Sequence, residues 1–145
     1  MNERFRLASV FTDHMVLCQN RPIRIFGEAQ DGIPLKAALH GGKANTIARS
    51  GRFELVLPPM PAGGPYTLTV NDGQSVYTCV DVLIGEVYLA GGQSNMELEL
   101  QNADDGQRLV AEASNSQIRY YNVPKQPWLT QQALEDERHS SWQSR

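Results

Sequence analysis

The sequence predicts two parts of different fold class: an all-β domain of the sandwich or barrel type, followed by the beginning of an α/β domain. The first prediction rests on short β-forming runs between Phe5 and Tyr77, separated by turn residues at close intervals. The second rests on a change of period after Asp81, where a long apolar run precedes a helical pattern and another β-rich run. We place the boundary between residues 80 and 81, giving a domain 1–80 and an incomplete domain 81–145.

Each predicted strand of the first part lies between turn residues such as Asp31-Gly32 and Ser50-Gly51. Within one of them, Tyr66, Leu68 and Val70 alternate with two threonines, which predicts one apolar and one polar face. Asp72-Gly73 is a hairpin signal. The predicted strands are Met15–Leu17, Ile23–Phe26, Leu35–Leu39, Thr46–Ala48, Phe53–Leu57, Tyr66–Val70 and Val76–Cys79.

The apolar run Val82–Ala90 predicts a buried strand that ends at Gly91-Gly92, with Ser94 just beyond it. In open α/β sheets, ligands bind at the carboxyl ends of such strands, and glycine lets the backbone approach a substrate closely. A serine there, beside free backbone N–H groups, suits a nucleophile with an oxyanion hole. An ordinary strand-to-helix turn has the same composition. The α/β-hydrolase elbow is excluded, because Met96 replaces its second glycine.

A helix is predicted from Ala103 to Ala113, with Asn102 or Asp104 as its N-cap. A β-rich run, Ile118–Val123, follows it, so the order strand, helix, strand predicts a parallel β–α–β unit. From Lys125 onward the periodic pattern stops. One such unit leaves apolar faces that a full doubly wound sheet would bury, so we expect a truncated α/β domain.

Composition narrows the functional classes. The 145 residues carry a net charge of −3, which argues against a nucleic-acid partner. No apolar stretch reaches membrane-spanning length and no signal peptide is recognisable, so we expect a cytoplasmic protein without a membrane partner. Cys18 and Cys79 belong to no Cys-x-x-Cys pair. We interpret them as small buried hydrophobic residues, with a disulfide as the alternative.

Several segments, in order, resemble the sialate O-acetylesterases and related carbohydrate esterases of the SGNH-hydrolase superfamily. The most specific is Gly92-Gln93-Ser94-Asn95-Met96. The resemblance implies a jelly-roll-like β-sandwich accessory domain followed by the start of a three-layer α/β SGNH-hydrolase domain with a parallel sheet, the N-terminal portion only. Cys18 departs from the glutamine that is usual in the family. The other matching segments are Leu7–Leu17, Ile23–Ala29, Leu57–Tyr66, Asp81–Met96, Ile118-Arg119 and Trp142.

The resemblance also implies roles for individual residues. Ser94 would be the nucleophile that attacks the acetyl ester of an O-acetylated carbohydrate, and Gly92, Gln93 and Asn95 would shape the oxyanion and substrate site. The remaining oxyanion donors and the catalytic base come from later segments of the longer family members, so activity would require that remainder. Apart from the resemblance, an exposed apolar sheet edge near Val87 and Ile118 would favour a homo-oligomer or a complementary C-terminal chain. No cofactor is implied.

Asp136 and His139 spell the Asp-x-x-His of a catalytic pair. Their surroundings are polar and carry no predicted strand, so we interpret them as part of a solvated loop or a frayed helix. His14 is expected to make structural hydrogen bonds, and His40 lies in a turn. No histidine, cysteine or carboxylate cluster has metal-ligand spacing, so no metal is predicted.

Three functions therefore stay open. The first is a serine-dependent carbohydrate O-acetylesterase, whose acetylated sugar, sialate or xylan, the sequence does not specify. The second is a non-catalytic β-sandwich module that binds carbohydrate or stabilises a neighbour. The third is a small hydrolase built from Ser94 and His139. A glycosidase built on Glu97 and Glu99 is disfavoured, because carboxylates this close in sequence usually mark a solvated edge.

Overall fold

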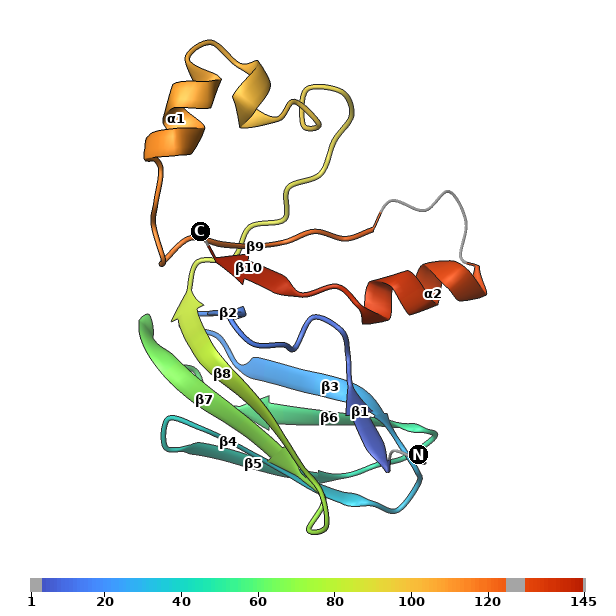
Figure 1. Ribbon diagram of the computed structural model, residues 1–145. Coiled ribbons are helices and arrows are strands. Elements are labelled where there is room, and N and C mark those ends of the chain that lie inside the picture. Colours follow the sequence, from blue (N-terminus) through green and yellow to red (C-terminus); the bar gives the residue numbers. More distant parts are fainter. Residues whose placement is uncertain (1–3, 125–129, 145) are drawn as a thin grey trace.

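The computed structural model describes residues 4–124 and 130–144 and is mostly β-sheet (Figure 1). Its strands are β1 (Phe5–Leu7), β2 (Val16–Cys18), β3 (Ile23–Ala29), β4 (Pro34–Leu39), β5 (Gly42–Ile47), β6 (Arg52–Leu57), β7 (Gly63–Asn71), β8 (Val76–Gly85), β9 (Arg119–Tyr121) and β10 (Trp142–Ser144). Its helices are the 3₁₀ helix η1 (Leu100–Asn102), α1 (Gly106–Glu112) and α2 (Gln131–Arg138).

Two sheets form the first part of the chain. The larger has the order β2-β8-β7-β4-β5 and the smaller the order β1-β3-β6. All neighbouring strands in both sheets are antiparallel except β2 and β8, which run parallel with Val16 opposite Leu83. The larger sheet is therefore mixed. Its edge strand β2 lies far in sequence from β8, the strand with which it pairs.

A single hydrophobic core joins the two sheets. Alternate residues of β6, among them Leu55 and Leu57, are fully buried, and so are Leu35 and Leu39 of β4 in the other sheet. This alternation buries one face of each strand and leaves the other in solvent. The apolar runs of the first eighty residues thus produce the expected two-faced strands.

All seven strands predicted for the first part are present, and the structure adds β1. The Asp72-Gly73 signal is confirmed as the turn between β7 and β8, where the Oδ1 atom of Asp72 accepts backbone hydrogen bonds from Gln74 (2.9 Å) and Ser75 (2.7 Å). Gly73 adopts a φ of +86°, which glycine tolerates without steric cost.

The prediction of a strand over Val82–Ala90 is only half right. β8 crosses the predicted boundary between residues 80 and 81 without a break, belongs to the larger sheet and ends at Gly85. Residues 86–90 form no strand and their side chains are exposed. A strand needs a neighbour to pair its backbone groups, and the described residues provide none beside this segment.

The parallel β–α–β unit predicted after Asp81 is not formed within the described residues. The helix exists as α1, but β9 pairs antiparallel with β10, with Tyr121 opposite Trp142. The prediction that the polar C-terminal region carries no strand was therefore wrong at Trp142–Ser144. This ribbon contacts the first part of the chain: the indole N–H of Trp142 donates to the carbonyl oxygen of Val10 (2.8 Å) and the hydroxyl of Tyr121 to Ser9 Oγ (3.2 Å).

Within the described residues, none of the helices is long and apolar enough to cross a membrane.

Candidate functional site

The segment that carries Ser94 begins where β8 ends. Every side chain from residue 86 to residue 100 is exposed. Residues 93–97 form a helix-like turn, in which the N–H of Met96 donates to the Gln93 carbonyl (2.8 Å) and the N–H of Glu97 to the Ser94 carbonyl (3.2 Å). A Cβ atom at Gly92 would lie 3.2 Å from that of Met96, which is a tight contact, so glycine favours this close return of the chain.

Ser94, Gln93 and Asn95 are exposed at this turn. Within the described part of the chain, no hydrogen bond uses the backbone N–H of Ser94 or of Asn95. These two backbone amides therefore remain available to donate hydrogen bonds to a bound group, which is one requirement of an oxyanion hole. The local geometry is therefore compatible with the role that the sequence resemblance implies for Ser94.

A cavity of about 860 Å³ lies beside this segment. Its walls are residues 86–92, Met96 and Glu97 on one side and residues 119–123 on the other, completed by residues of the first part and by Trp142. Gly92 lines it, whereas Gln93, Ser94 and Asn95 do not. The structure thus brings one of the predicted site residues to the cavity and leaves three in the exposed turn beyond it.

A charged cluster that the sequence did not predict lies at Asp81, before the end of β8. The carboxylate of Asp81 is 2.6 Å from Nδ1 of His14 and 3.0 Å from Nη1 of Arg119. Arg119 also donates to the carbonyl oxygens of Ser116 (2.7 Å) and His14 (3.1 Å), and its side chain is only 4% exposed. The hydrogen bond from Arg119, followed by that from His14, lowers the pKa of Asp81 below its usual 3.8.

This His14–Asp81–Arg119 cluster is structural in character. It joins the loop before β2, the middle of β8 and the start of β9, which confirms the expected hydrogen-bonding role of His14. Two of its members, His14 and Asp81, have φ values of +67° and +54°. Non-glycine residues adopt this left-handed conformation only where surrounding contacts hold them in it. The sequence signal was faint: one acid at the start of an apolar run.

The Asp136–His139 segment covers the end of α2 and the turn after it, as the frayed-helix interpretation allowed. Asp136 lies in α2, its carboxylate accepts a hydrogen bond from Gln132 (2.9 Å), and the backbone N–H of His139 donates to the Asp136 carbonyl (3.2 Å). The side chain of His139 is exposed.

His40 has a packing role, because its ring stacks on that of Tyr66 at a centroid distance of 4.0 Å.

Both cysteines are free thiols, as interpreted from the sequence. Cys79 is buried, and burial raises the pKa of its thiol to about 12, whereas Cys18 is half-buried. Over residues 4–124 and 130–144, no group of three or more histidine, cysteine, aspartate or glutamate side chains is arranged to hold a metal ion.

Comparison with known proteins places the chain in a family. No protein-family model matches it. The sialate O-acetylesterases of Pongo abelii and Homo sapiens are each 32% identical to it over 146 residues, which is 91% of this chain. At the level of family, this chain is a homologue of the sialate O-acetylesterases. It spans about a quarter of their length, since the match covers 27% of each relative.

The structure supports the relationship. A carbohydrate acetylesterase from Xanthomonas citri superposes with a TM-score of 0.84 over 97% of this chain, with 33% sequence identity. The matched region is 32% of that protein. This sialate O-acetylesterase homologue therefore corresponds in sequence and in fold to a minor part of larger esterases.

Proposed function

We propose that this chain is the portion of a carbohydrate O-acetylesterase that carries the nucleophile, Ser94. The supporting observation is that Ser94 is exposed and that its own backbone N–H and that of Asn95 are unpaired. Ser94 lies on the segment that follows β8, the last strand of the well-packed β-sheet unit (residues 4–85). Its homologues are esterases, and one related structure is a carbohydrate acetylesterase. An O-acetylated carbohydrate is therefore the proposed substrate.

In the proposed reaction, the Oγ atom of Ser94 attacks the carbonyl carbon of the acetyl group, and a base accepts the hydroxyl proton. The oxyanion accepts hydrogen bonds from the Ser94 amide and the glycine-rich turn, while Gln93 and Asn95 shape the site. Collapse of the tetrahedral intermediate breaks the ester bond and releases the sugar hydroxyl, which takes up a proton. Water then hydrolyses the acetyl-serine, releasing acetate.

The base is proposed to come from polypeptide that corresponds to the rest of the longer relatives. The exposed segment after β8 supports this, because Tyr88 and Leu89 are 83% and 98% exposed, although both are large and apolar. Large apolar side chains that are consecutive in sequence and both exposed indicate a surface that contacts another part of a protein. With the remaining strands in place, residues 86–90 would continue β8 as the first strand of an SGNH-type parallel sheet, and residues 4–80 would be its β-sandwich accessory domain.

Hydrolysis of a small activated acetyl ester tests this proposal. The chain alone, its Ser94→Ala variant and its His139→Ala variant are compared, and all three are expected to hydrolyse the ester no faster than background. Adding the remaining two thirds of the Xanthomonas citri relative is expected to give a rate that Ser94→Ala abolishes and His139→Ala leaves unchanged. Efficient hydrolysis that survives Ser94→Ala would refute the proposal. A rate of the chain alone lost in both variants would support the small Ser94–His139 hydrolase instead.

A further inference from the structure

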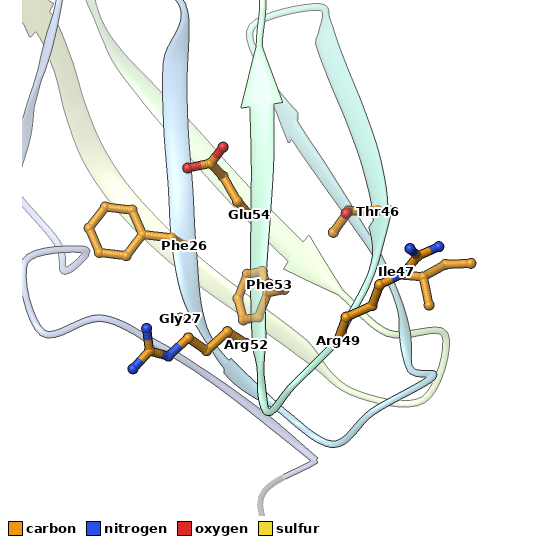
Figure 2. A pocket seen from close by; sticks show the side chains of 8 residues that line it. All are labelled: Phe26, Gly27, Thr46, Ile47, Arg49, Arg52, Phe53 and Glu54. Atoms are coloured by element: carbon orange, nitrogen blue, oxygen red, sulfur yellow. The ribbon is translucent and has the colours of Figure 1, made fainter.

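A second cavity lies on the β-sheet unit, at the seam between the two sheets (Figure 2). Its volume is about 460 Å³, and it lies over β6 and the end of β5, which are edge strands of different sheets. Its lining combines two cations, Arg49 and Arg52, with the polar residues Thr46 and Glu54 and the apolar residues Phe26 and Ile47. Ser94 and its neighbours do not line this cavity.

A rigid turn holds the two arginines in place. Arg49 and Arg52 form an antiparallel pair that exchanges both backbone hydrogen bonds, at 2.9 and 3.1 Å. The two residues between them, Ser50 and Gly51, have φ values of +54° and +74°, as in a type I′ hairpin turn. The N–H of Gly51 also donates to the carboxylate of Asp31 (2.7 Å), which fixes the turn to the neighbouring loop.

In the described residues, neither Arg49 nor Arg52 has an ion pair, whereas the nearby Arg6 and Arg24 are paired with Glu28 and Glu54, each at 2.7 Å. Figure 2 shows the two unpaired side chains extending in opposite directions, Arg52 toward Gly27 and Arg49 toward Ile47, with Phe53 between them. An anionic ligand that reaches both ends of the cavity would give each arginine the ion-pair partner that it lacks.

The rest of the lining narrows the chemistry of that anion. Phe26 is 45% and Ile47 is 55% exposed, so the cavity offers apolar surface to a ligand that also carries the charge. The face of an aromatic ring is electronegative and attracts the C–H groups of a sugar ring. The hydroxyl of Thr46 can donate to and accept from sugar hydroxyls, and the carboxylate of Glu54, which is paired with Arg24, can accept from them. Two cations are few for a nucleic acid, whose affinity grows with the number of phosphate contacts.

We propose that this cavity is a binding site for a carboxylate-bearing oligosaccharide, separate from the Ser94 turn. Arg49 and Arg52 bind the sugar carboxylates, and Phe26 and Ile47 contact the apolar faces of the rings. The site does not depend on ester hydrolysis, so it holds whether or not the proposed function is correct. In a complete esterase it would retain a charged glycan on the enzyme between successive cleavages.

Calorimetric titration of the whole chain tests this proposal, with an oligomer of galacturonic acid as the probe and its neutral methyl ester as the matched control. The acid is expected to bind at least about ten-fold more tightly than the ester, because two charge-assisted hydrogen-bonding groups are involved. Arg49→Gln and Arg52→Gln are each expected to weaken binding of the acid by about ten-fold. Arg21→Gln, which removes the same charge outside the cavity, is expected to leave the affinity unchanged.

The Ser94→Ala variant is expected to bind the acid as the natural chain does, which separates this site from the catalytic proposal. Equal affinity for the acid and its methyl ester, or no affinity for either, would overturn the inference. So would equal losses in Arg21→Gln and Arg52→Gln. If inorganic phosphate displaced the oligosaccharide and bound with the same affinity, the cavity would be a simple anion site, and this result would also overturn the inference.

Discussion

The Nδ1 atom of His14 lies 2.6 Å from the Oδ2 atom of Asp81, although 67 positions separate the two residues in the chain. The contact is made at an irregularity of β8, because Leu68 and Tyr66 of β7 face Cys79 and Val82, with one extra residue on β8. Such a bulge turns a side chain out of the normal alternation. Here it directs Asp81 toward His14 and Arg119. The second half of β8 is therefore fixed to the loop before β2 and to the start of β9.

Replacing Arg119 by methionine is expected to destabilise the protein. The change removes the hydrogen bonds to Asp81, Ser116 and the His14 carbonyl and leaves Asp81 without its arginine partner. Loss of charge-assisted bonds from a buried side chain costs about 2–3 kcal/mol. Urea denaturation measures the free energy of unfolding. Arg24→Met, which breaks an exposed ion pair, serves as the control and is expected to cost less than about 1 kcal/mol. Equal effects would contradict this role of Arg119.

Asp72 makes stability depend on pH. The hydrogen bond from the backbone of Ser75, helped by Gln74 and Arg4 and opposed by burial, lowers the pKa of Asp72 below its usual 3.8. A carboxyl group with a lower pKa in the folded state contributes stability above its unfolded pKa and loses it as the pH falls through the folded pKa. The free energy of unfolding is therefore expected to decline as the pH falls from about 5 toward 3.

The Asp72→Asn variant isolates this contribution. It keeps an oxygen acceptor for Ser75 but removes the charge paired with Arg4 at 2.6 Å. It is expected to be about 1 kcal/mol less stable than the natural chain near neutral pH, with a smaller difference at acidic pH. A constant difference between the two proteins at every pH would show that the charge of Asp72 does not matter.

Gly27 is expected to tolerate no larger residue. A Cβ atom there would lie 2.0 Å from the backbone oxygen of Arg6 in β1, the antiparallel neighbour of β3, in which Leu7 is opposite Gly27. Backbone cannot move aside as a flexible side chain can, so Gly27→Ala is expected to cost about 3 kcal/mol or more, measured by urea denaturation. Gly85→Ala is the matched control, because its nearest neighbour would be Val16 Cγ1 at 3.8 Å. Its effect is expected to stay within about 0.5 kcal/mol.

Cys79 is expected to be inert toward thiol reagents in the folded protein. Burial raises the pKa of its thiol to about 12, so almost no thiolate exists near neutral pH. A colorimetric disulfide reagent is expected to modify the half-buried Cys18 first and Cys79 only after denaturation. The Cys18→Ala variant tests this directly. If that variant still reacted rapidly without denaturant, the assignment of Cys79 to the core would be wrong.

Much of the β-sheet unit was predictable because its signals are local. Alternation along Tyr66–Val70 specifies a two-faced strand, and Asp72-Gly73 specifies its turn, whatever the rest of the chain does. β1 was missed because Arg6 interrupts its three residues, whereas the three residues of β2 form a continuous apolar run. The free state of both cysteines followed from their spacing and composition.

Residues 81–145 were less predictable, because their hydrophobic pattern is that of strands with neighbours in a sheet, and the described residues do not supply those neighbours. The hydrophobic pattern of Val82–Ala90 is that of a strand buried on both faces, yet residues 86–90 remain unpaired. β9 then pairs with Trp142–Ser144, in a region whose polar composition gave no strand signal. For the site, the role of Ser94 stays a prediction that rests on the family resemblance, and the structure adds that its segment forms an exposed turn. The Arg119 contacts were not predicted, because they join segments far apart in sequence.

The parallel pairing of β2 with β8 also has a kinetic consequence. The hairpins β4–β5 and β7–β8 close short loops, whereas β2 must find β8 across most of the β-sheet unit. Long-range pairings pay a larger entropy of loop closure before any contact is gained, so they form late and set the folding rate. Refolding of this chain is therefore expected to be limited by the arrival of β2, and the serine turn reaches its final place only after that slow step.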